Sequence, residues 1–169
     1  MRAIPWLLTA FLAAAPLASA QSPGLEGTFA SKASGQAVID AAIDAGVAKM
    51  NFIKRPIARK RLKSTNIAYG RVAIQRSAQT ISVQFDANPP VVMPLDGTAV
   101  KWTRADGEVF DVHAQWQDAR LVQTFKSEDG QRVNTFTIAD ADTLVLDVAV
   151  SSPQLPSPVE YRLQFARSP

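Results

Sequence analysis

The sequence predicts a mainly β protein, an antiparallel up-and-down barrel or strongly curved meander sheet with an N-terminal helix-turn-helix. Two observations support this prediction. Apolar residues recur every three or four positions from Ile39 to Ile53, and from Tyr69 onward they alternate with polar residues. The first period is that of a helix, and the second that of a strand with one buried face. Short, regularly spaced turns favour a meander, and closing a meander into a barrel removes its exposed edges.

The helical pair is predicted over residues 35–64. The apolar face of its first helix consists of Ile39, Ile43, Val47, Met50 and Ile53. Ser34 is placed to cap this helix, because a serine hydroxyl can accept a hydrogen bond from a free backbone N–H of the first turn. Pro56 disfavours helical geometry at the residue before it and suits the first turn of a new helix. A second, short helix therefore follows, and Asn66 ends it.

The strand meander is predicted over residues 69–167. Nine strands are expected near residues 69–77, 79–86, 91–95, 98–105, 108–117, 120–127, 131–138, 143–150 and 159–166. Asp96-Gly97, Asp106-Gly107 and Asp129-Gly130 indicate hairpin turns, because glycine readily adopts the positive φ that these turns need. The one long connection, residues 151–158, contains three prolines.

Residues 1–20 have the composition of a cleavable signal peptide, and residues 21–169 then form a single domain. Arg2 is followed by an apolar stretch, and Ala18-Ser19-Ala20 has the small-x-small pattern of a peptidase site. The chain contains no cysteine, so Gln21 offers no site for a lipid anchor, and thiolate catalysis and thiolate metal sites are excluded. We expect an exported, soluble protein of the periplasm or the exterior.

Positive charge is concentrated in the first half of the expected mature chain. Between residues 49 and 63, seven cations occur without an acidic residue, namely Lys49, Lys54, Arg55, Arg59, Lys60, Arg61 and Lys63. This basic run is either a solvated helix face or a contact for an anionic membrane surface or another polyanion. Nucleic acid is a poor fit, because no basic stretch interleaves aromatic residues for base stacking.

Side chains on the apolar faces of the strands are the candidates for a barrel interior. They are Phe85, Trp102, Phe110, Trp116, Phe125, Tyr161 and Phe165, and they either line a ligand cavity or fill it as core. Arg76 and Arg104 share apolar strand faces. Each arginine therefore lies at a strand end in water or places a cation in the cavity, and burial of an unpaired charge is costly.

Known catalytic and metal-binding patterns are missing from the sequence. His113 is the only histidine and falls on the polar face of its strand, and Asp140 and Asp142 fit a turn better than a calcium loop. No nucleophile motif or phosphate-binding loop occurs. We therefore expect neither an enzyme, nor a bound metal, nor a cofactor.

The order of the elements resembles the fatty-acid-binding protein branch of the calycin superfamily, which includes the lipocalins. Gly27-Thr28-Phe29 is similar to the glycine-x-aromatic opening of the first strand, although lipocalins have tryptophan at the third position. Fatty-acid-binding proteins end with an arginine-x-tyrosine that grips a carboxylate. Here the last strand reads Tyr161-Arg162-Leu163, and alternation points Arg162 away from Tyr161, so that clamp does not transfer.

The leading hypothesis is non-enzymatic binding of an apolar or amphipathic, lipid-like small molecule inside the barrel, with the basic helical pair facing an anionic surface. The contact residues for that surface would be Lys54, Arg55, Arg59, Lys60, Arg61 and Lys63. The alternative is a periplasmic interaction protein with a filled β core. An outer-membrane barrel is less favoured, because the expected strands are short and no aromatic girdles are evident. The sequence leaves the oligomeric state open.

Overall fold

The computed structural model describes residues 24–168. Two helices, α1 (Gln36–Val47) and α2 (Arg55–Thr65), follow the first strand. The ten strands are β1 (Gly27–Ser31), β2 (Arg71–Arg76), β3 (Thr80–Phe85), β4 (Val91–Pro94), β5 (Val100–Thr103), β6 (Val109–Gln117), β7 (Arg120–Lys126), β8 (Gln131–Asp140), β9 (Thr143–Ser151) and β10 (Val159–Arg167). The predicted fold class is confirmed, and the predicted signal peptide lies outside the described residues.

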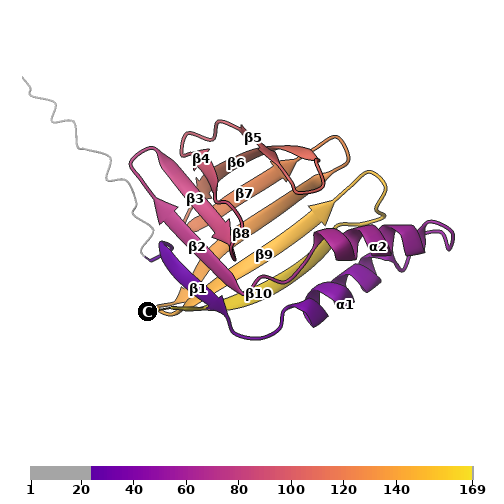
Figure 1. The fold of residues 1–169 in the computed structure, drawn as a ribbon. Coiled ribbons are helices and arrows are strands. Elements are labelled where there is room, and N and C mark those ends of the chain that lie inside the picture. The colour runs from indigo at the N-terminus through magenta and orange to yellow at the C-terminus, as the bar shows by residue number, and fades with distance from the viewer. Residues whose placement is uncertain (1–23, 169) are drawn as a thin grey trace, which may run out of the picture.

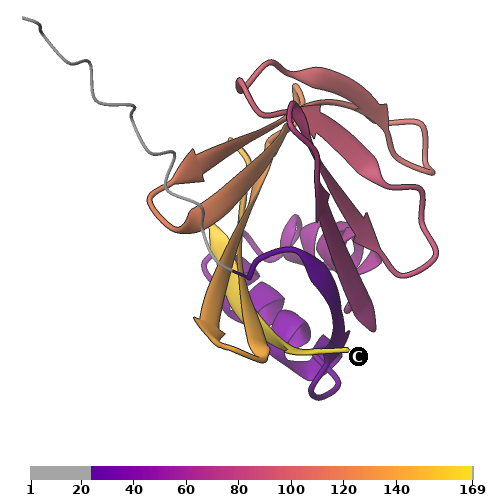
Figure 2. The same cartoon turned by 90° about the vertical axis from the view of Figure 1, so that its left-hand side faces the viewer.

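All ten strands belong to one antiparallel sheet that curls into a nearly closed barrel (Figure 1). Their order is β4-β3-β2-β1-β10-β9-β8-β7-β6-β5, so the first and last strands of the chain pair with each other. Figure 2 shows the two walls that result, one of early strands and one of late strands. The ends of the sheet, β4 and β5, share no hydrogen-bonded ladder, and β4 lies against β6 across the gap.

Because β4 and β5 are not paired, one of the predicted hairpins is wrong. Asp96-Gly97 lies in the connection between β4 and β5, so it does not join paired strands. Gly97 has the expected positive φ of 84°. β4 ends at Pro94, and its pairing with β3 closes one residue later, where the Leu95 N–H donates to the Gln79 carbonyl at 2.9 Å.

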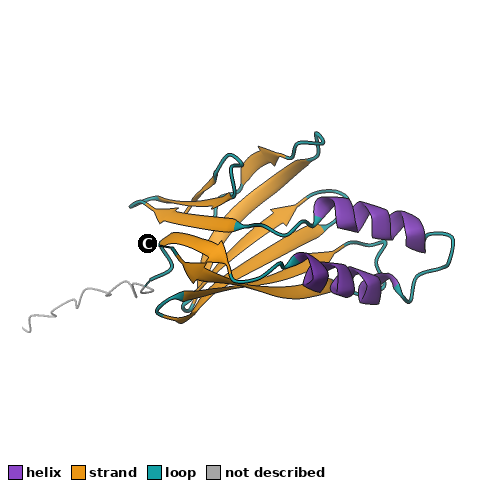
Figure 3. Cartoon of the chain, turned by 60° about the horizontal axis from the view of Figure 1, so that its bottom comes forward, coloured by secondary structure: helices purple, strands orange, loops and turns teal. Residues whose placement is uncertain are grey.

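The helical pair covers one end of the barrel, with the two helices in contact side by side (Figure 3). The buried face of α1 consists of Ile39, Ile43 and Val47, and α1 contacts β10. The backbone of α1 can lie close to β10 because Gly46, which faces this strand, has no side chain. A Cβ atom at Gly46 would lie 2.6 Å from Cγ2 of Val159.

Two details of the first predicted helix are wrong. Gly35, not Ser34, is the N-cap residue, and no side chain caps the helix. The helix also ends at Val47, so Ile53 lies beyond it with 63% of its surface exposed. After Val47 the backbone forms tighter turns, as the Met50 N–H donates to the Val47 carbonyl at 3.0 Å, and Asn51 Oδ1 then accepts a hydrogen bond from the Ile53 N–H at 2.9 Å. Such local side-chain bonds compete with helical ones.

The second helix follows the prediction more closely. Pro56 occupies its first turn, and Leu62 is its buried residue. Asn66 is the C-cap, as expected, and its backbone N–H donates to the Leu62 carbonyl at 2.9 Å.

One continuous cluster of apolar side chains lies between the walls and beneath α1. Alternating residues of every long strand point into it, and Phe29, Phe136 and Phe165 are fully buried. This core includes residues of both helices, so the helical pair is an integral part of the domain.

Candidate ligand-binding site inside the barrel

Polar side chains lie among the apolar ones on the inner face of the barrel. Asn66, Gln123 and Asn134 are 3%, 0% and 1% exposed. Groups buried this deeply need hydrogen-bond partners inside the protein. Each of them has such partners, and together with Arg132 and Tyr161 they form a connected set that we call the interior polar cluster.

The first part of this cluster crosses the barrel from β8 to β4. Arg132 Nε donates to Asn134 Oδ1 at 2.9 Å, and Asn134 Nδ2 donates to Gln123 Oε1 at 3.0 Å. Gln123 Nε2 in turn reaches the sulfur of Met93 at 3.5 Å. The two walls of the barrel are therefore connected through polar atoms at this level.

The second part lies beneath the end of α2. Arg132 Nη1 and the Tyr161 hydroxyl both donate to Asn66 Oδ1, at 3.1 and 3.2 Å. Burial raises the pKa of the Tyr161 phenol, so it stays a neutral donor at physiological pH. Two donors, one of them charged, thus converge on a single acceptor oxygen. The same geometry suits a carboxylate or another oxygen-rich head group.

Aromatic rings occur in two groups on the inner face. In the first, Tyr69 stacks on Phe85 with ring centroids 4.3 Å apart, and Phe85 lies 6.3 Å from Phe136. In the second, the Trp102 ring lies 5.8 Å from Phe110 and 5.3 Å from Phe125. Rings of this kind supply the apolar walls of small-molecule sites, in which a few polar groups fix orientation.

The structure places most of the aromatic candidates on the inner face. Phe85, Trp102, Phe110 and Phe125 belong to the two ring groups, and Tyr161 belongs to the interior polar cluster. Phe165 and Trp116 contribute to the apolar core. Their part in ligand binding stays a prediction.

Neither predicted arginine joins the interior polar cluster. Arg76 is exposed at the end of β2, with its guanidinium 5.6 Å from the ring centroid of Trp116. Arg104 follows β5 and pairs with Asp106 and Glu108, each at 2.6 Å. Both therefore lie at strand ends, the first of the two predicted arrangements.

The cation of the interior polar cluster is the half-buried Arg132, which is not among the predicted site residues. The available signal was the alternation in β8, where Arg132 and Asn134 share a face with the buried Phe136. An arginine in line with buried residues indicates a cation that faces the core. Arg162, by contrast, is exposed on β10 and pairs with Asp147 at 2.6 Å, as its position in the alternation predicts.

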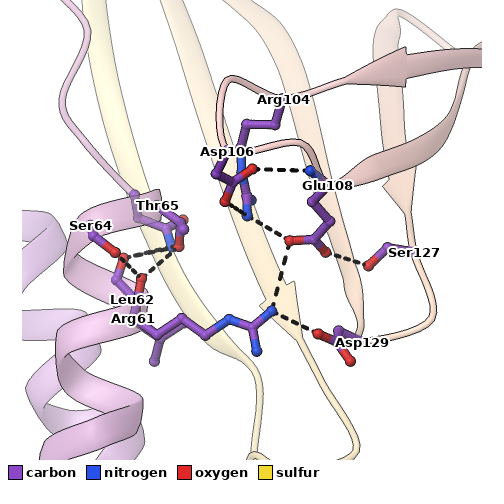
Figure 4. A network of polar contacts seen from close by, with 10 residues as sticks. Arg61, Leu62, Ser64, Thr65, Arg104, Asp106, Glu108, Ser127 and Asp129 are labelled. Atoms are coloured by element: carbon purple, nitrogen blue, oxygen red, sulfur yellow. Dashed lines mark hydrogen bonds and ion pairs between the residues drawn. The ribbon is translucent and has the colours of Figure 1, made fainter.

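Part of the basic run is already neutralised by acidic residues of the protein. Arg61 pairs with Asp129 at 2.7 Å and lies 3.7 Å from Glu108 (Figure 4). Arg104 and Asp106 complete this α2 ion network, which joins the second helix to two strand-connecting turns. Farther along the helices, Arg59 pairs with Asp44, and Lys63 lies 3.5 Å from Asp40.

The remaining cations lie near the turn between the helices. Among residues 24–168, no ion pair involves Lys49, Lys54 or Lys60, and all three are exposed. Arg55 instead donates to the Met50 carbonyl at 2.9 Å. Large apolar side chains are exposed in the same segment, namely Phe52 at 77%, Ile57 at 69% and Ile53. We call this segment, residues 49–60, the helical tip.

The described residues contain neither a candidate metal site nor a helix that could span a membrane. Within residues 24–168, no three His, Asp or Glu side chains come together in a way that would hold a metal ion. Over the same residues, no helix is both long enough and apolar enough to span a bilayer. His113 lies partly exposed on the outward face of β6.

Comparison with known proteins identifies the fold. No protein-family model matches the sequence, and no curated protein matches it. Among solved structures, the REP1-NXSQ fatty acid transporter is similar with a TM-score of 0.56 and 13% identity over 86% of this chain and 96% of its own. Fatty-acid-binding protein 1 of Echinococcus granulosus has a TM-score of 0.58 and 9% identity over 86% and 98% of the two chains.

A secretary abundant heat soluble protein from Ramazzottius varieornatus is similar to the same extent, with a TM-score of 0.59 and 11% identity over 85% of this chain and 95% of its own. The chain thus has the fold of the fatty-acid-binding proteins, and the predicted resemblance in architecture is confirmed. At these identities the likeness concerns the fold.

Proposed function

We propose that the protein is a non-enzymatic binder of an amphipathic small molecule, held in the barrel with its head group at the interior polar cluster. The observation that carries this proposal is the convergence of Arg132 and Tyr161 on one acceptor position, in a barrel whose inner face also carries two groups of aromatic rings. Arg132 is half-buried, and a cation removed from part of its water in this way favours polar or anionic partners. The fold, shared with a fatty acid transporter and a fatty-acid-binding protein, supports the same assignment.

A pair of arginine variants tests this function. Arg132→Gln removes the interior charge, whereas Arg162→Gln removes a charge from the outer face of β10. We expect Arg132→Gln to weaken the binding of a long-chain fatty acid by about tenfold or more, because a hydrogen bond to a charged group contributes about 1.5–3 kcal/mol. The matched control should bind as the wild type does. Equal affinities in all three proteins would contradict the proposal.

We also propose that the helical tip faces an anionic membrane surface. Lys49, Lys54 and Lys60, which form no ion pair within residues 24–168, alternate along the sequence with the exposed Phe52 and Ile57. Cations near an anionic membrane add about 1 kcal/mol of attraction each, and apolar side chains add to it when they enter the interface. The proposed contact differs from the predicted set. Lys49 joins Lys54 and Lys60, whereas Arg59, Arg61 and Lys63 have acidic partners within the protein.

Two triple variants distinguish the three lysines of the tip that form no ion pair from the ion-paired cations of the basic run. Substituting Lys49, Lys54 and Lys60 with glutamine should abolish most sedimentation with phosphatidylglycerol vesicles, and added salt should have the same effect. Substituting Arg59, Arg61 and Lys63 with glutamine should reduce sedimentation less. A larger loss with the second set would contradict the role of the tip.

An exported location completes the proposal. Residues 1–20 have the composition of a signal peptide, and cleavage after Ala20 leaves a chain that starts at Gln21. The intact mass of the protein recovered from its host should correspond to that start. Full-length protein in the cytoplasm would contradict export.

A filled core with no ligand is the second candidate. It is favoured by contacts between inner-face side chains of opposite walls, such as Gln123 with Met93 and Phe85 with Phe136. In that case the protein acts through its outer surface as an interaction protein. Native mass spectrometry that finds no bound lipid, together with no response to fatty acids, phospholipids or isoprenoids, would favour this function.

A further inference from the structure

Asn66 occupies the position in the barrel that a ligand head group needs. Its Oδ1 is the common acceptor for Arg132 Nη1 and the Tyr161 hydroxyl, and the residue is almost fully buried. A head group that binds these two donors must take the place of that oxygen. We propose that Asn66 is an internal substitute for the head group and that its displacement sets head-group selectivity. This inference rests on the proposed function.

The energy of exchange favours an anionic head group. Asn66 offers a neutral amide oxygen, so an alcohol that replaces it exchanges one neutral acceptor for another. The bond from the Arg132 guanidinium to this amide has one charged partner, whereas a carboxylate pairs two opposite charges with the guanidinium and can accept two of its N–H groups at once. The wild-type protein should therefore bind a fatty acid more tightly than the alcohol of the same chain length.

Displacement of Asn66 also affects α2. The amide nitrogen of Asn66 donates to the Leu62 carbonyl at 3.0 Å and thereby caps the end of this helix. When the Asn66 side chain moves away from Arg132 and Tyr161, its amide nitrogen moves as well. The Leu62 carbonyl then loses one of its hydrogen-bond donors. Arg61 still ties α2 to Asp129 at the surface. Ligand binding is thus expected to loosen the last turn of α2 rather than to release the whole helix.

Two substitutions at this position should change affinity in opposite directions. Asn66→Ala removes the competing acceptor, so fatty acid affinity should rise by about fivefold, the equivalent of one net hydrogen bond. Asn66→Asp places a carboxylate beside Arg132, which holds the guanidinium and repels the incoming acid. Its fatty acid affinity should fall by at least tenfold. A purely structural role would make both variants weaker binders, because both lose the cap.

Hydrogen exchange supplies a readout that does not depend on affinity. Saturation of the wild type with oleate should speed amide exchange in the last turn of α2, around residues 62–66, by at least threefold. Exchange in α1 should stay unchanged and serves as the internal control. In Asn66→Ala the last turn should exchange rapidly even without oleate, since the side-chain cap is missing.

The outcomes separate this inference from the function on which it rests. If neither the wild type nor Asn66→Ala binds oleate, the proposed function fails and the inference with it. If Arg132→Gln weakens oleate binding but both Asn66 variants shift affinity in the same direction, the binding function stands and the role of Asn66 is overturned. Unchanged exchange in α2 on oleate binding would overturn it as well.

Discussion

The carboxylate of Asp106 has a pKa of about 2, against an ordinary value of 3.8. Its main cause is the side-chain hydrogen bond from Arg104, which donates through Nε at 2.9 Å and Nη2 at 2.6 Å. Because folding lowers this pKa, the folded state gains stability from Asp106 above about pH 4 and loses it as the pH falls through about 2.

The Asp106→Asn variant isolates this contribution. We expect its urea midpoint to lie below that of the wild type by a constant amount above pH 5, and the difference to shrink between pH 4 and pH 2. Glu128→Gln is the control, because Glu128 is exposed and forms no ion pair among the described residues. A difference that persists unchanged at pH 2 would assign the effect to the shape of the turn instead of its charge.

Individual site residues differ in how well the sequence predicts them. Phe85, Phe110 and Phe125 were predictable as inward-facing because a strand places every second side chain on the same face. The alternation in β8 also indicates that Arg132 faces inward, but its pairing with Asn66 was not predictable, because that pairing joins positions 66 residues apart. Alternation assigns a side chain to a face, and only the tertiary structure shows which side chains meet across the barrel.

At the scale of elements, the contact between α1 and β10 depends on the absence of a side chain at Gly46. On an exposed helix surface, a glycine-to-alanine change stabilises by roughly 0.5–1 kcal/mol. Here the new methyl group would overlap Cγ2 of Val159. Gly46→Ala should therefore lower the free energy of unfolding by about 1–3 kcal/mol, the usual cost of overpacking.

A double-mutant cycle with Val159→Ala checks the cause. Removing the Cγ atoms of Val159 makes room for the new methyl group, so the double variant should be more stable than the sum of the two single changes predicts. Chemical denaturation of the four proteins gives the coupling energy. If the changes in the free energy of unfolding were strictly additive, the effect of Gly46→Ala would arise within the helix alone.

The sequence predicts the type of most elements and misses how some of them end. Hydrophobic periodicity identifies both helices and the strands after Tyr69, since burial of one face dominates their stability. It extends the first helix to Ile53 because it ignores Asn51, whose side chain supports a turn in place of another helical turn. It also joins β4 to β5 through Asp96-Gly97, because a turn dipeptide shows where the chain bends and leaves strand pairing undetermined.

At the scale of the whole molecule, the gap in the sheet is a place where the chain could begin and end without separating two paired strands. The sheet is joined between its first and last strands, where Arg167 binds the carbonyl groups of Gly24 and Glu26. It is open in mid-chain, between β4 and β5. A circular permutant that links the ends of the domain through a short flexible peptide and begins at Gly97 would break no strand ladder.

Such a permutant should fold, because chains tolerate rearrangement where their ends lie close and the new break falls in a loop. A break between β8 and β9, at Asp142, is the matched comparison, since it cuts a hairpin whose strands are paired along most of their length. We expect circular dichroism and a cooperative melt close to those of the parent for the first permutant, and a lower melting temperature for the second. In the first permutant, the β5 segment would lie at the new N-terminus and the β4 segment at the new C-terminus. A reporter or an anchor fused to either end would then lie beside the gap between β4 and β5.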